Sequence, residues 1–215
     1  MRDCIIIPLK RIDSAKSRLS SYLNPIQRRE FSLLMLSDVL DACIDSSFSK
    51  IFLVTQEKID ILSYKEKIEQ IIDDSELNIA LKNAIDKVKR LGYEYFLIIP
   101  SDIPLIEKED LGILKKLISK YDLIISPSFD SGTNALFMKK DKEIELEYGE
   151  GKNSFLRHLE HAQSKNLNVY IFSNERISLD IDDHVRMKYL AKLDINKKSI
   201  LYIKKIYEEN RNIRN

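Results

Sequence analysis

The sequence has little of three features that would place it in a special class of protein: cysteine, unbalanced charge and long apolar runs. Only two cysteines occur in 215 residues, Cys4 and Cys43, and their spacing supports neither a disulfide nor a metal pair. We therefore expect two small core side chains in a reducing, cytoplasmic compartment. The 35 basic residues balance 34 acidic ones, which excludes a global electrostatic attraction to nucleic acid or membranes.

No apolar run approaches the roughly 18 residues that a membrane-spanning helix needs, so we expect no membrane association. The opening "MRDCIIIPLK" carries an acid at Asp3 and has too short an apolar core for a signal peptide. It is more typical of a first strand. Repeats, low-complexity tracts and clear linkers are also lacking, and the length predicts one domain over residues 1–215.

The chain also lacks the glycine-rich motifs of two common nucleotide-binding folds. Neither the G-x-x-x-x-G-K-[ST] of a P-loop nor the G-x-G-x-x-G of a dinucleotide-binding unit occurs. Any phosphate binding must therefore depend on other residues. It must also be local, because the net charge is only +1.

A cationic segment, "PLKRIDSAKSRL", follows the first apolar run and offers such a place. Against one acid it carries four basic residues: Lys10, Arg11, Lys16 and Arg18. Arginine presents a planar fork to phosphate and lysine a mobile charge, and the hydroxyls of Ser14 and Ser17 add polar partners. Loops at strand ends commonly carry function, so we predict a phosphate-binding loop. The alternative is a solvated basic loop.

Short apolar runs alternate with longer amphipathic stretches, which is typical of an α/β protein whose mainly parallel sheet is covered on both faces. Strands are expected at Cys4–Ile7, Ile51–Thr55, Tyr95–Ile99, Leu123–Ser126, Ala135–Met138 and Val169–Phe172. Helices are expected at Pro25–Ser46, Asn78–Leu91, Lys108–Lys120, Ser154–Ser164, Asp183–Leu193 and Lys197–Glu209. Residues 57–75 fit either a helix or a short strand.

Capping and breaking residues support these boundaries. Asn24 fits an N-cap, with Gln27 as its partner in a capping box. Three of the five prolines, Pro8, Pro100 and Pro127, each end a predicted strand. Ligands of open parallel sheets bind beyond the carboxyl ends of the strands, so these prolines indicate the functional edge.

Two acidic segments have the character of metal-binding turns. Asp102, in "IIPSDIPLI", is held between two prolines at the predicted rim of the sheet. Mg²⁺ commonly takes one or two carboxylates together with substrate phosphates, and Asp102 fits that role. In "SLDIDDHV", alternation places Asp180 and Asp182 on one side of an extended segment, while Asp183 fits the N-cap of the next helix. Capping of turns or helices is the alternative for both segments.

Glycines and hydroxyl residues gather between residues 127 and 158, in "SPSFDSGTNALF" and "EYGEGKNSFLRHL". Turns of this kind, and the helix start expected at Ser154, expose backbone N–H groups to anions. Two hairpin turns and an ordinary N-cap are the alternative. His158 fits a partly buried helix residue better than a phosphate donor, and no zinc-ligand spacing is present. Together the three kinds of segment suggest Mg²⁺-dependent phosphoryl or nucleotidyl chemistry.

These motifs, taken in order, resemble a known family, the 2-phospho-L-lactate guanylyltransferases of coenzyme F420 biosynthesis. The resemblance extends to about Leu190 and is carried by six segments: "IIPLKRIDSAKSRL", "ELNIAL", "PSDIPLI", "GTNAL", "NSFLRHL" and "LDID". The turn "YGEGKNSF" is longer than the family's "FGxGSF"-like turn, so its matching glycine is Gly149 or Gly151. The family's "LDVDTPEDL" is replaced by "LDIDDHVRM".

The resemblance implies a GT-A-like, Rossmann-related nucleotidyltransferase fold, a three-layer sandwich with a mostly parallel mixed sheet. It implies transfer of GMP from GTP to 2-phospho-L-lactate, giving lactyl-2-diphospho-5′-guanosine and pyrophosphate. The enzyme would be a cytoplasmic homodimer that uses Mg²⁺.

Carried over to this chain, the resemblance assigns catalysis to Lys16, Arg18 and Asp102. The residues assigned to GTP are Lys10, Ser14, Lys16, Ser17, Arg18 and Asn78, the last orienting the guanosine. Those assigned to the phospho-acid are Thr133, Gly151 and Ser154. Asp102 and Asp180 would hold Mg²⁺, with Asp182 as second choice for the later ligand.

Three alternatives stay open. The same chemistry could use phosphoenolpyruvate or 3-phosphoglycerate as the acceptor. A nucleotide-binding module could keep the fold without turnover, although such a module has less need of two acidic sites. A sugar-nucleotide glycosyltransferase of similar fold would place a D-x-D pair earlier than Asp180–Asp182.

Overall fold

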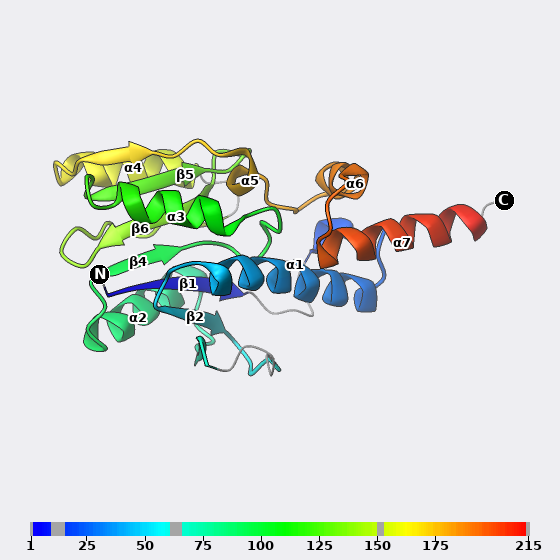
Figure 1. The fold of residues 1–215 in the computed structure, drawn as a ribbon, viewed down its shortest axis with the longest axis horizontal. Coiled ribbons are helices and arrows are strands. Elements are labelled where there is room, and N and C mark those ends of the chain that lie inside the picture. The colour runs from blue at the N-terminus through cyan, green and yellow to red at the C-terminus, as the bar shows by residue number, and fades with distance from the viewer. Residues whose placement is uncertain (1, 10–15, 61–65, 150–152, 214–215) are drawn as a thin grey trace.

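The protein, seen in a computed structural model that describes residues 2–9, 16–60, 66–149 and 153–213, is an α/β sandwich (Figure 1). One seven-stranded sheet has the order β3-β2-β1-β4-β6-β5-β7. The strands are β1 (Asp3–Leu9), β2 (Lys50–Thr55), β3 (Ile68–Ile72), β4 (Tyr95–Ile98), β5 (Leu123–Pro127), β6 (Thr133–Lys139) and β7 (Val169–Ile171). Neighbouring strands are parallel except where β6 pairs with β4 and β5, so the predicted mostly parallel mixed sheet is confirmed.

The edge strand β3 is the element that the sequence pattern left undecided. Its residues, "IEQII", place half-buried Glu69 and Gln70 between buried Ile68 and Ile71, so they neither alternate strictly nor form a continuous apolar run. Its sheet partner is β2, in parallel register from Ile51 to Thr55. The conformation of this segment is therefore decided by pairing with a distant strand more than by its own pattern.

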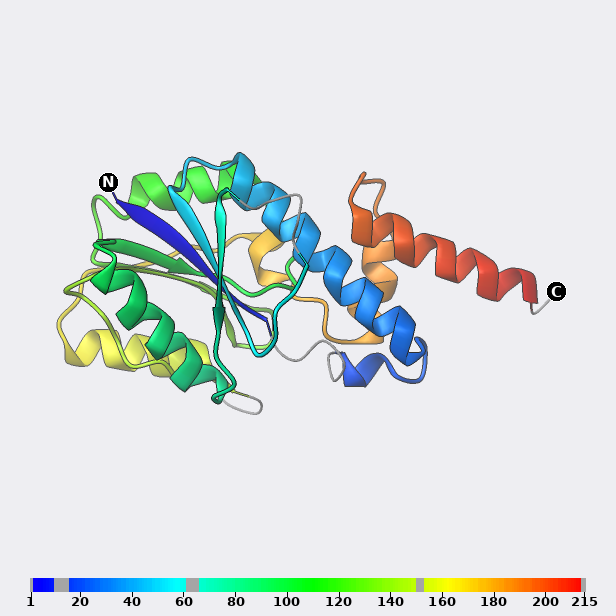
Figure 2. The same cartoon turned by 90° about the horizontal axis from the view of Figure 1, so that it is seen from below.

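Helices cover both faces of the sheet, as predicted (Figures 1 and 2). They are α1 (Pro25–Asp45), α2 (Leu77–Arg90), α3 (Lys108–Leu117), α4 (Ser154–Ser164), α5 (Glu175–Ser178), α6 (His184–Lys192) and α7 (Lys198–Ile213), with a 3₁₀ turn, η2 (Ser17–Leu19). Buried side chains of α1, α3 and α5 share one apolar cluster with the sheet, and those of α2 and α4 share another.

The central strand β1 is buried on both faces because its side chains alternate between these two clusters. Ile5 and Ile7 belong to the α1 side, and Cys4 and Ile6 to the α2 side. Cys4 and Cys43 are both buried and free, which confirms that they are core side chains. The strand β1 is therefore covered on both faces, as its continuous apolar run predicted.

The predicted caps are also confirmed. Asn24 Oδ1 accepts a hydrogen bond from the Gln27 backbone N–H (2.9 Å), and Gln27 Oε1 accepts one from the Asn24 N–H (3.0 Å). At the start of α6, Asp183 Oδ1 accepts from the Arg186 N–H (2.9 Å). These bonds satisfy N–H groups that have no partner within the helix.

A third apolar cluster lies beyond the end of the sheet, where α6 and α7 pack against the first half of α1 (Figure 2). We call α6 and α7 the helical extension. Its anchor is the buried carboxylate of Asp38 on α1, which accepts from the backbone N–H groups of Lys198 and Ser199 (both 2.9 Å) and from Ser199 Oγ (2.6 Å). A carboxylate at a helix N-terminus satisfies free N–H groups and opposes the positive end of the helix dipole.

None of the helices in the described part of the chain is both long and apolar enough to cross a membrane.

The Asp38 anchor generates a stability prediction. Replacing Asp38 with Ala leaves two N–H groups and one hydroxyl at the buried start of α7 without their acceptor. We expect a loss of about 2–3 kcal/mol in the free energy of unfolding, measured by urea denaturation. Asp41→Ala is the matched control, because Asp41 pairs with the same Lys198 in an exposed ion pair (2.7 Å) and should cost less than about 1 kcal/mol. Equal losses in the two variants would contradict the assigned anchor role.

Candidate functional site

The carboxyl edge of the sheet carries a cavity of about 400 Å³. Pro8 at the end of β1, Pro100 just after β4, and the turn that joins β5 to β6 all border it. Because β6 runs opposite to its neighbours, its first residue, Thr133, lies at the same edge as the ends of the parallel strands. The predicted functional edge is therefore where the structure has its cavity.

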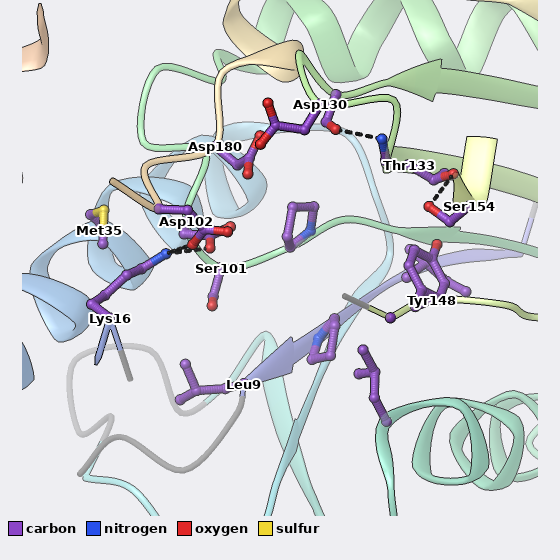
Figure 3. Close-up of a pocket in the computed structure, with 18 of the residues that line it drawn as sticks. Leu9, Lys16, Met35, Ser101, Asp102, Asp130, Thr133, Tyr148, Ser154 and Asp180 are labelled. Carbon is purple, nitrogen blue, oxygen red and sulfur yellow. Dashed lines mark hydrogen bonds and ion pairs between the residues drawn. The ribbon is translucent and has the colours of Figure 1, made fainter. Parts of the chain in front are cut away.

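Many of the predicted site residues are brought together there. Those that line the cavity are Lys16, Ser17, Arg18, Asp102, Thr133, Ser154 and Asp180, together with Gly149 and Asp182. Figure 3 shows the charged residues Lys16, Asp102 and Asp180 toward one end of the cavity and the hydroxyl residues Thr133 and Ser154 toward the other. Lys10, Ser14 and Gly151 lie outside the described residues. Asn78 does not line the cavity but contacts a residue that does.

The two acidic segments are joined through their backbones. The Ile181 N–H donates to the carbonyl of Asp102 (3.0 Å), although the two residues are far apart in the sequence. Asp180 is further fixed by Asn134, whose Nδ2 donates to Asp180 Oδ1 (3.2 Å) and to the carbonyl of Ile177 (2.9 Å). The carboxylates of Asp102, Asp180 and Asp182 are thereby held at one end of the cavity.

Lys16 neutralises part of this negative charge. Its Nζ lies 2.6 Å from Asp102 Oδ2 and 2.6 Å from Asp182 Oδ1. Burial alone would lower the pKa of Lys16, but the charges of Asp102 and Asp182 outweigh burial and raise it. The backbone of Lys16 is left-handed (φ 57°, ψ 39°), an uncommon conformation for a side chain of this size. Lys16 is the N-cap of the turn η2.

The pKa of Asp180 is raised even though the Arg186 guanidinium lies 3.6 Å away. Burial raises its pKa, and the neighbouring charges of Asp102 and Asp182 raise it further. Asp102 Oδ1 is buried without a hydrogen-bond partner. Carboxylate oxygens that repel one another are suitable donors for a hard divalent cation such as Mg²⁺. Within the described ranges, however, no three acidic, histidine or cysteine side chains are already arranged around one metal position. Ligand oxygens would have to complete such a site.

The hydroxyl end of the cavity is organised by His158. His158 is buried, and its Nε2 accepts a hydrogen bond from the Glu147 N–H (3.0 Å). The proton of the neutral ring must then reside on Nδ1, which donates to Thr133 Oγ1 (2.9 Å). Ser154 Oγ also donates to Thr133 Oγ1 (3.3 Å). With its oxygen accepting twice, the Thr133 hydroxyl has its own proton left to donate into the cavity.

A tight turn between β5 and β6 fixes the position of Thr133. Ser128 Oγ accepts from the Gly132 N–H (2.8 Å), and the Ser128 N–H donates to the Gly132 carbonyl (2.8 Å). A Cβ atom on Gly132 would lie 2.7 Å from Ser128 Oγ, closer than packed atoms allow. A side chain at this position of "GTNAL" would displace the Ser128 hydroxyl from its hydrogen bond with the Gly132 N–H.

Asn78 contacts the backbone of Tyr148 with both ends of its amide group. Nδ2 donates to the Tyr148 carbonyl (2.9 Å), and Oδ1 accepts from the Tyr148 N–H (2.9 Å). These bonds hold the segment that leads into Gly149 and place Tyr148 against the cavity. The predicted contact with guanosine remains a prediction, whereas the contact present here positions this turn.

Sequence reasoning gave no role to Asn134 or Arg186. Arg186 lies beside Asp180 (3.6 Å) and Asp183 (3.8 Å) and pairs with Asp130. It follows Asp183 by three residues, the spacing at which side chains of one helix meet, and this was the available signal. Asn134 had no such signal, because its partner Asp180 is distant in the sequence and only the folded chain brings them together.

Solved structures show which fold class this arrangement belongs to. The structure aligns with a protein described as a nucleotide-diphospho-sugar transferase from Desulfovibrio desulfuricans G20 at a TM-score of 0.81, 18% identity, and coverage of 98% of this chain and 97% of that one. It aligns with a cytidylyltransferase from Leptospira borgpetersenii at a TM-score of 0.59, 14% identity, and coverage of 100% and 98%. The fold is that of the nucleotidyltransferases, as the sequence resemblance implied.

Sequence comparison gives the family. Residues 3–210 match the family model described as "Guanylyl transferase CofC like". Proteins named 2-phospho-L-lactate guanylyltransferase are similar at 40% identity over 83% of this chain and 77% of the relative in Methanocaldococcus jannaschii, and at 33% over 94% and 89% in Archaeoglobus fulgidus. The chain belongs to this guanylyltransferase family.

The His158 geometry generates a prediction on pH. Burial lowers the pKa of His158 to about 4 from 6.5, with the charge of His161 adding to the effect. Because the unfolded chain binds this proton more readily than the folded one, stability should fall as pH drops from about 6.5 toward 4. The loss should approach roughly 3 kcal/mol at the lower end. The measurement is the free energy of unfolding by urea across this range.

His158→Gln should remove this part of the pH dependence, because glutamine does not titrate. His184→Gln serves as the matched control, since it leaves His158 in place and should keep the loss. An unchanged pH profile in His158→Gln would show that the histidine is not the group responsible.

Proposed function

We propose that this protein is a 2-phospho-L-lactate guanylyltransferase of coenzyme F420 biosynthesis. It transfers GMP from GTP to 2-phospho-L-lactate, giving lactyl-2-diphospho-5′-guanosine and pyrophosphate. The observation that carries the proposal is the similarity over most of the chain to relatives of that name, 39% identical over 83% of this chain in Methanocaldococcus vulcanius. The cavity supports it, because cationic, acidic and hydroxyl side chains meet at the edge where such folds bind ligands.

The reaction needs positioning and charge neutralisation more than covalent help from the protein. A phosphate oxygen of the acceptor attacks the α-phosphorus of GTP and forms a new P–O bond. The bond from that phosphorus to the oxygen bridging to the β-phosphate breaks, and pyrophosphate leaves with the electron pair. The acceptor oxygen is already ionised, so no general base is required. The main obstacle is the repulsion between two anions.

Asp102 and Asp180 would hold Mg²⁺. The ion, when bound, would supply charge neutralisation between the acceptor and the α-phosphate. The unpartnered Asp102 Oδ1 and the charge-raised pKa of Asp180 support this assignment. Asp182 lies on the same side and is the second choice.

Lys16 and Arg18 would bind the triphosphate and stabilise the departing pyrophosphate. Lys16 is paired with Asp102 and Asp182 (both 2.6 Å). If Asp102 and Asp180 held Mg²⁺, Lys16 would lose Asp102 as one of its two partners, and its ammonium group would be available for phosphate oxygens. Lys16 would thus neutralise the acidic side chains when no ligand is bound and bind phosphate oxygens when the nucleotide is present. Ser17 borders the cavity at the same end.

Thr133 and Ser154 would receive the small phospho-acid. The Thr133 hydroxyl has its proton available because its oxygen accepts from His158 and Ser154. Ser154 also begins α4, where backbone N–H groups favour an anion. The hydroxyl end of the cavity thus suits a phosphate or carboxylate group.

The direct test is pyrophosphate release from purified protein with GTP and Mg²⁺. The assay compares 2-phospho-L-lactate, phosphoenolpyruvate and 3-phosphoglycerate. We expect release with 2-phospho-L-lactate, reduced about 100-fold or more in Asp102→Asn, because that variant loses a carboxylate assigned to Mg²⁺. Asp86→Asn, on the exposed face of α2, is the charge-matched control. Preference for another acceptor would support the proposed guanylyl transfer but assign a different phospho-acid as the substrate. No release from folded protein with any acceptor would refute the enzyme assignment.

The acceptor end has its own prediction. Thr133→Val keeps the shape of the side chain but removes the hydroxyl, so the KM for the phospho-acid should rise about 10- to 100-fold while the KM for GTP stays near its original value. Thr133→Ser keeps the hydroxyl and should retain most of the affinity. An equal rise in both KM values for Thr133→Val would argue against a contact confined to the acceptor.

A further inference from the structure

A second cavity, of about 320 Å³, borders the first. Pro8, Leu9, Leu77 and Leu81 line both, so the two hollows meet at the end of β1 and the start of α2. The second cavity is otherwise lined by residues at the ends of β2 and β3 and in the first turns of α2. None of the residues predicted to carry chemistry lines it, and the reaction derived above leaves it unused.

The lining has the character of a site for a flat heterocycle with a polar edge. The apolar residues are Pro8, Leu9, Val54, Leu77, Ala80 and Leu81, and the polar ones are Thr55, Gln56, Asp73, Ser75 and Glu76. Ligand sites are commonly apolar hollows with a few placed polar groups that give specificity. A nucleotide whose phosphates lie in the first cavity would extend its base toward this neighbouring one.

Asp73 is a polar group of this cavity that several hydrogen bonds hold in place. Its backbone N–H donates to the Thr55 carbonyl (2.8 Å), which fixes the residue at the end of β3 beside β2. Oδ1 accepts from the Ser75 N–H (2.9 Å), and Oδ2 accepts from Asn83 Nδ2 (2.8 Å). These bonds, that from Asn83 first, lower the pKa of the carboxyl. Each oxygen still has a second lone pair, so the group can accept two further bonds side by side.

Only some bases offer donors that match such a group. Guanine carries two adjacent donors, N1–H and the 2-amino group, spaced to meet the two oxygens of one carboxylate. Adenine has an acceptor at N1 and cytosine has one at N3. Each would direct a lone pair at the carboxylate, where guanine directs an N–H donor. A site built to accept from a ligand rejects analogues that lack the donor, because its polar group is then left unpaired.

We propose that the second cavity is the nucleobase subsite and that Asp73 selects guanine by accepting from its N1–H and 2-amino groups. This inference rests on the proposed guanylyl transfer and adds the residue that determines the choice of nucleotide. Glu76 also lines the cavity, but it is exposed and makes no side-chain cap of α2. Asp73 is preorganised by its bonds, and Glu76 is not.

The experiment compares GTP, ITP and ATP in wild-type protein and in Asp73→Asn at saturating acceptor. Inosine keeps N1–H but lacks the 2-amino group. The wild type should prefer GTP to ITP about tenfold and to ATP by more. In Asp73→Asn, kcat/KM with GTP should fall about 10- to 100-fold, the GTP:ITP ratio should approach one, and ATP should improve relative to GTP. The KM for the acceptor should not change.

Two control variants test whether the effect belongs to Asp73 or to a neighbouring carboxylate. Asp74→Asn removes the same charge from an exposed neighbour that does not line the cavity, and it should leave both rates and ratios unchanged. Glu76→Gln removes the other carboxylate of the cavity and should keep the GTP:ITP ratio. Loss of that ratio in Glu76→Gln, with retention in Asp73→Asn, would overturn the assignment of Asp73.

Equilibrium binding of GDP and IDP keeps this test independent of turnover. Weaker GDP binding in Asp73→Asn, with loss of the preference over IDP, supports the subsite even if no transfer occurs with any acceptor. Unchanged preference in folded Asp73→Asn overturns it, even if the enzyme is active. Asp73→Ser provides a second variant if Asp73→Asn does not fold. Equal wild-type binding of GDP and IDP would itself refute guanine selection through the 2-amino group.

Discussion

The mutual repulsion of three carboxylates is the constraint on which the rest of the site depends. Asp102 lies in one segment and Asp180 and Asp182 lie in another that is distant in the sequence, and a backbone hydrogen bond from Ile181 to Asp102 joins the two segments. Like charges brought this close require a positive partner. Lys16 supplies it at 2.6 Å from two of them. Lys16, both acidic turns and the raised pKa of Asp180 belong to one electrostatic arrangement.

An apolar cluster opposes that repulsion. The turn that carries Asp102 contributes Leu105 to the cluster beneath the helical extension, and the later acidic segment contributes Leu179 and Ile181. The cationic segment contributes Leu19 to the same cluster. Each segment that brings a charged residue to the cavity therefore also contributes an apolar residue, within three positions, to this buried cluster. Burial of those neighbours stabilises the close approach of the charges, which gives α6 and α7 a part in forming the site.

The sequence was informative where local chemistry decides the structure. Apolar runs located the central strands, and Asn24 and Asp183 marked the helix starts that their hydrogen bonds confirm. Pro8, Pro100 and Pro127 indicated the edge that carries the cavity. The sequence was uninformative where a contact with a distant residue determines the structure. The strand β3 forms by pairing with β2, and the hydrogen bond from Asn134 to Asp180 forms only when β6 lies beside the late acidic segment. The tautomer of His158 likewise depends on the backbone of Glu147, which no periodicity reveals.

Lys16 has a consequence for how the folded chain is maintained. Because its ammonium group already lies between Asp102 and Asp182, the acidic turns have a counter-ion that is part of the polypeptide. Some small metal-binding domains unfold when a chelator removes their metal, because binding of the ion supplies the free energy of folding. Here the counter-ion is covalently attached and survives chelation. Part of the negative charge of the acidic turns is therefore neutralised by the polypeptide itself, whether or not a metal is bound.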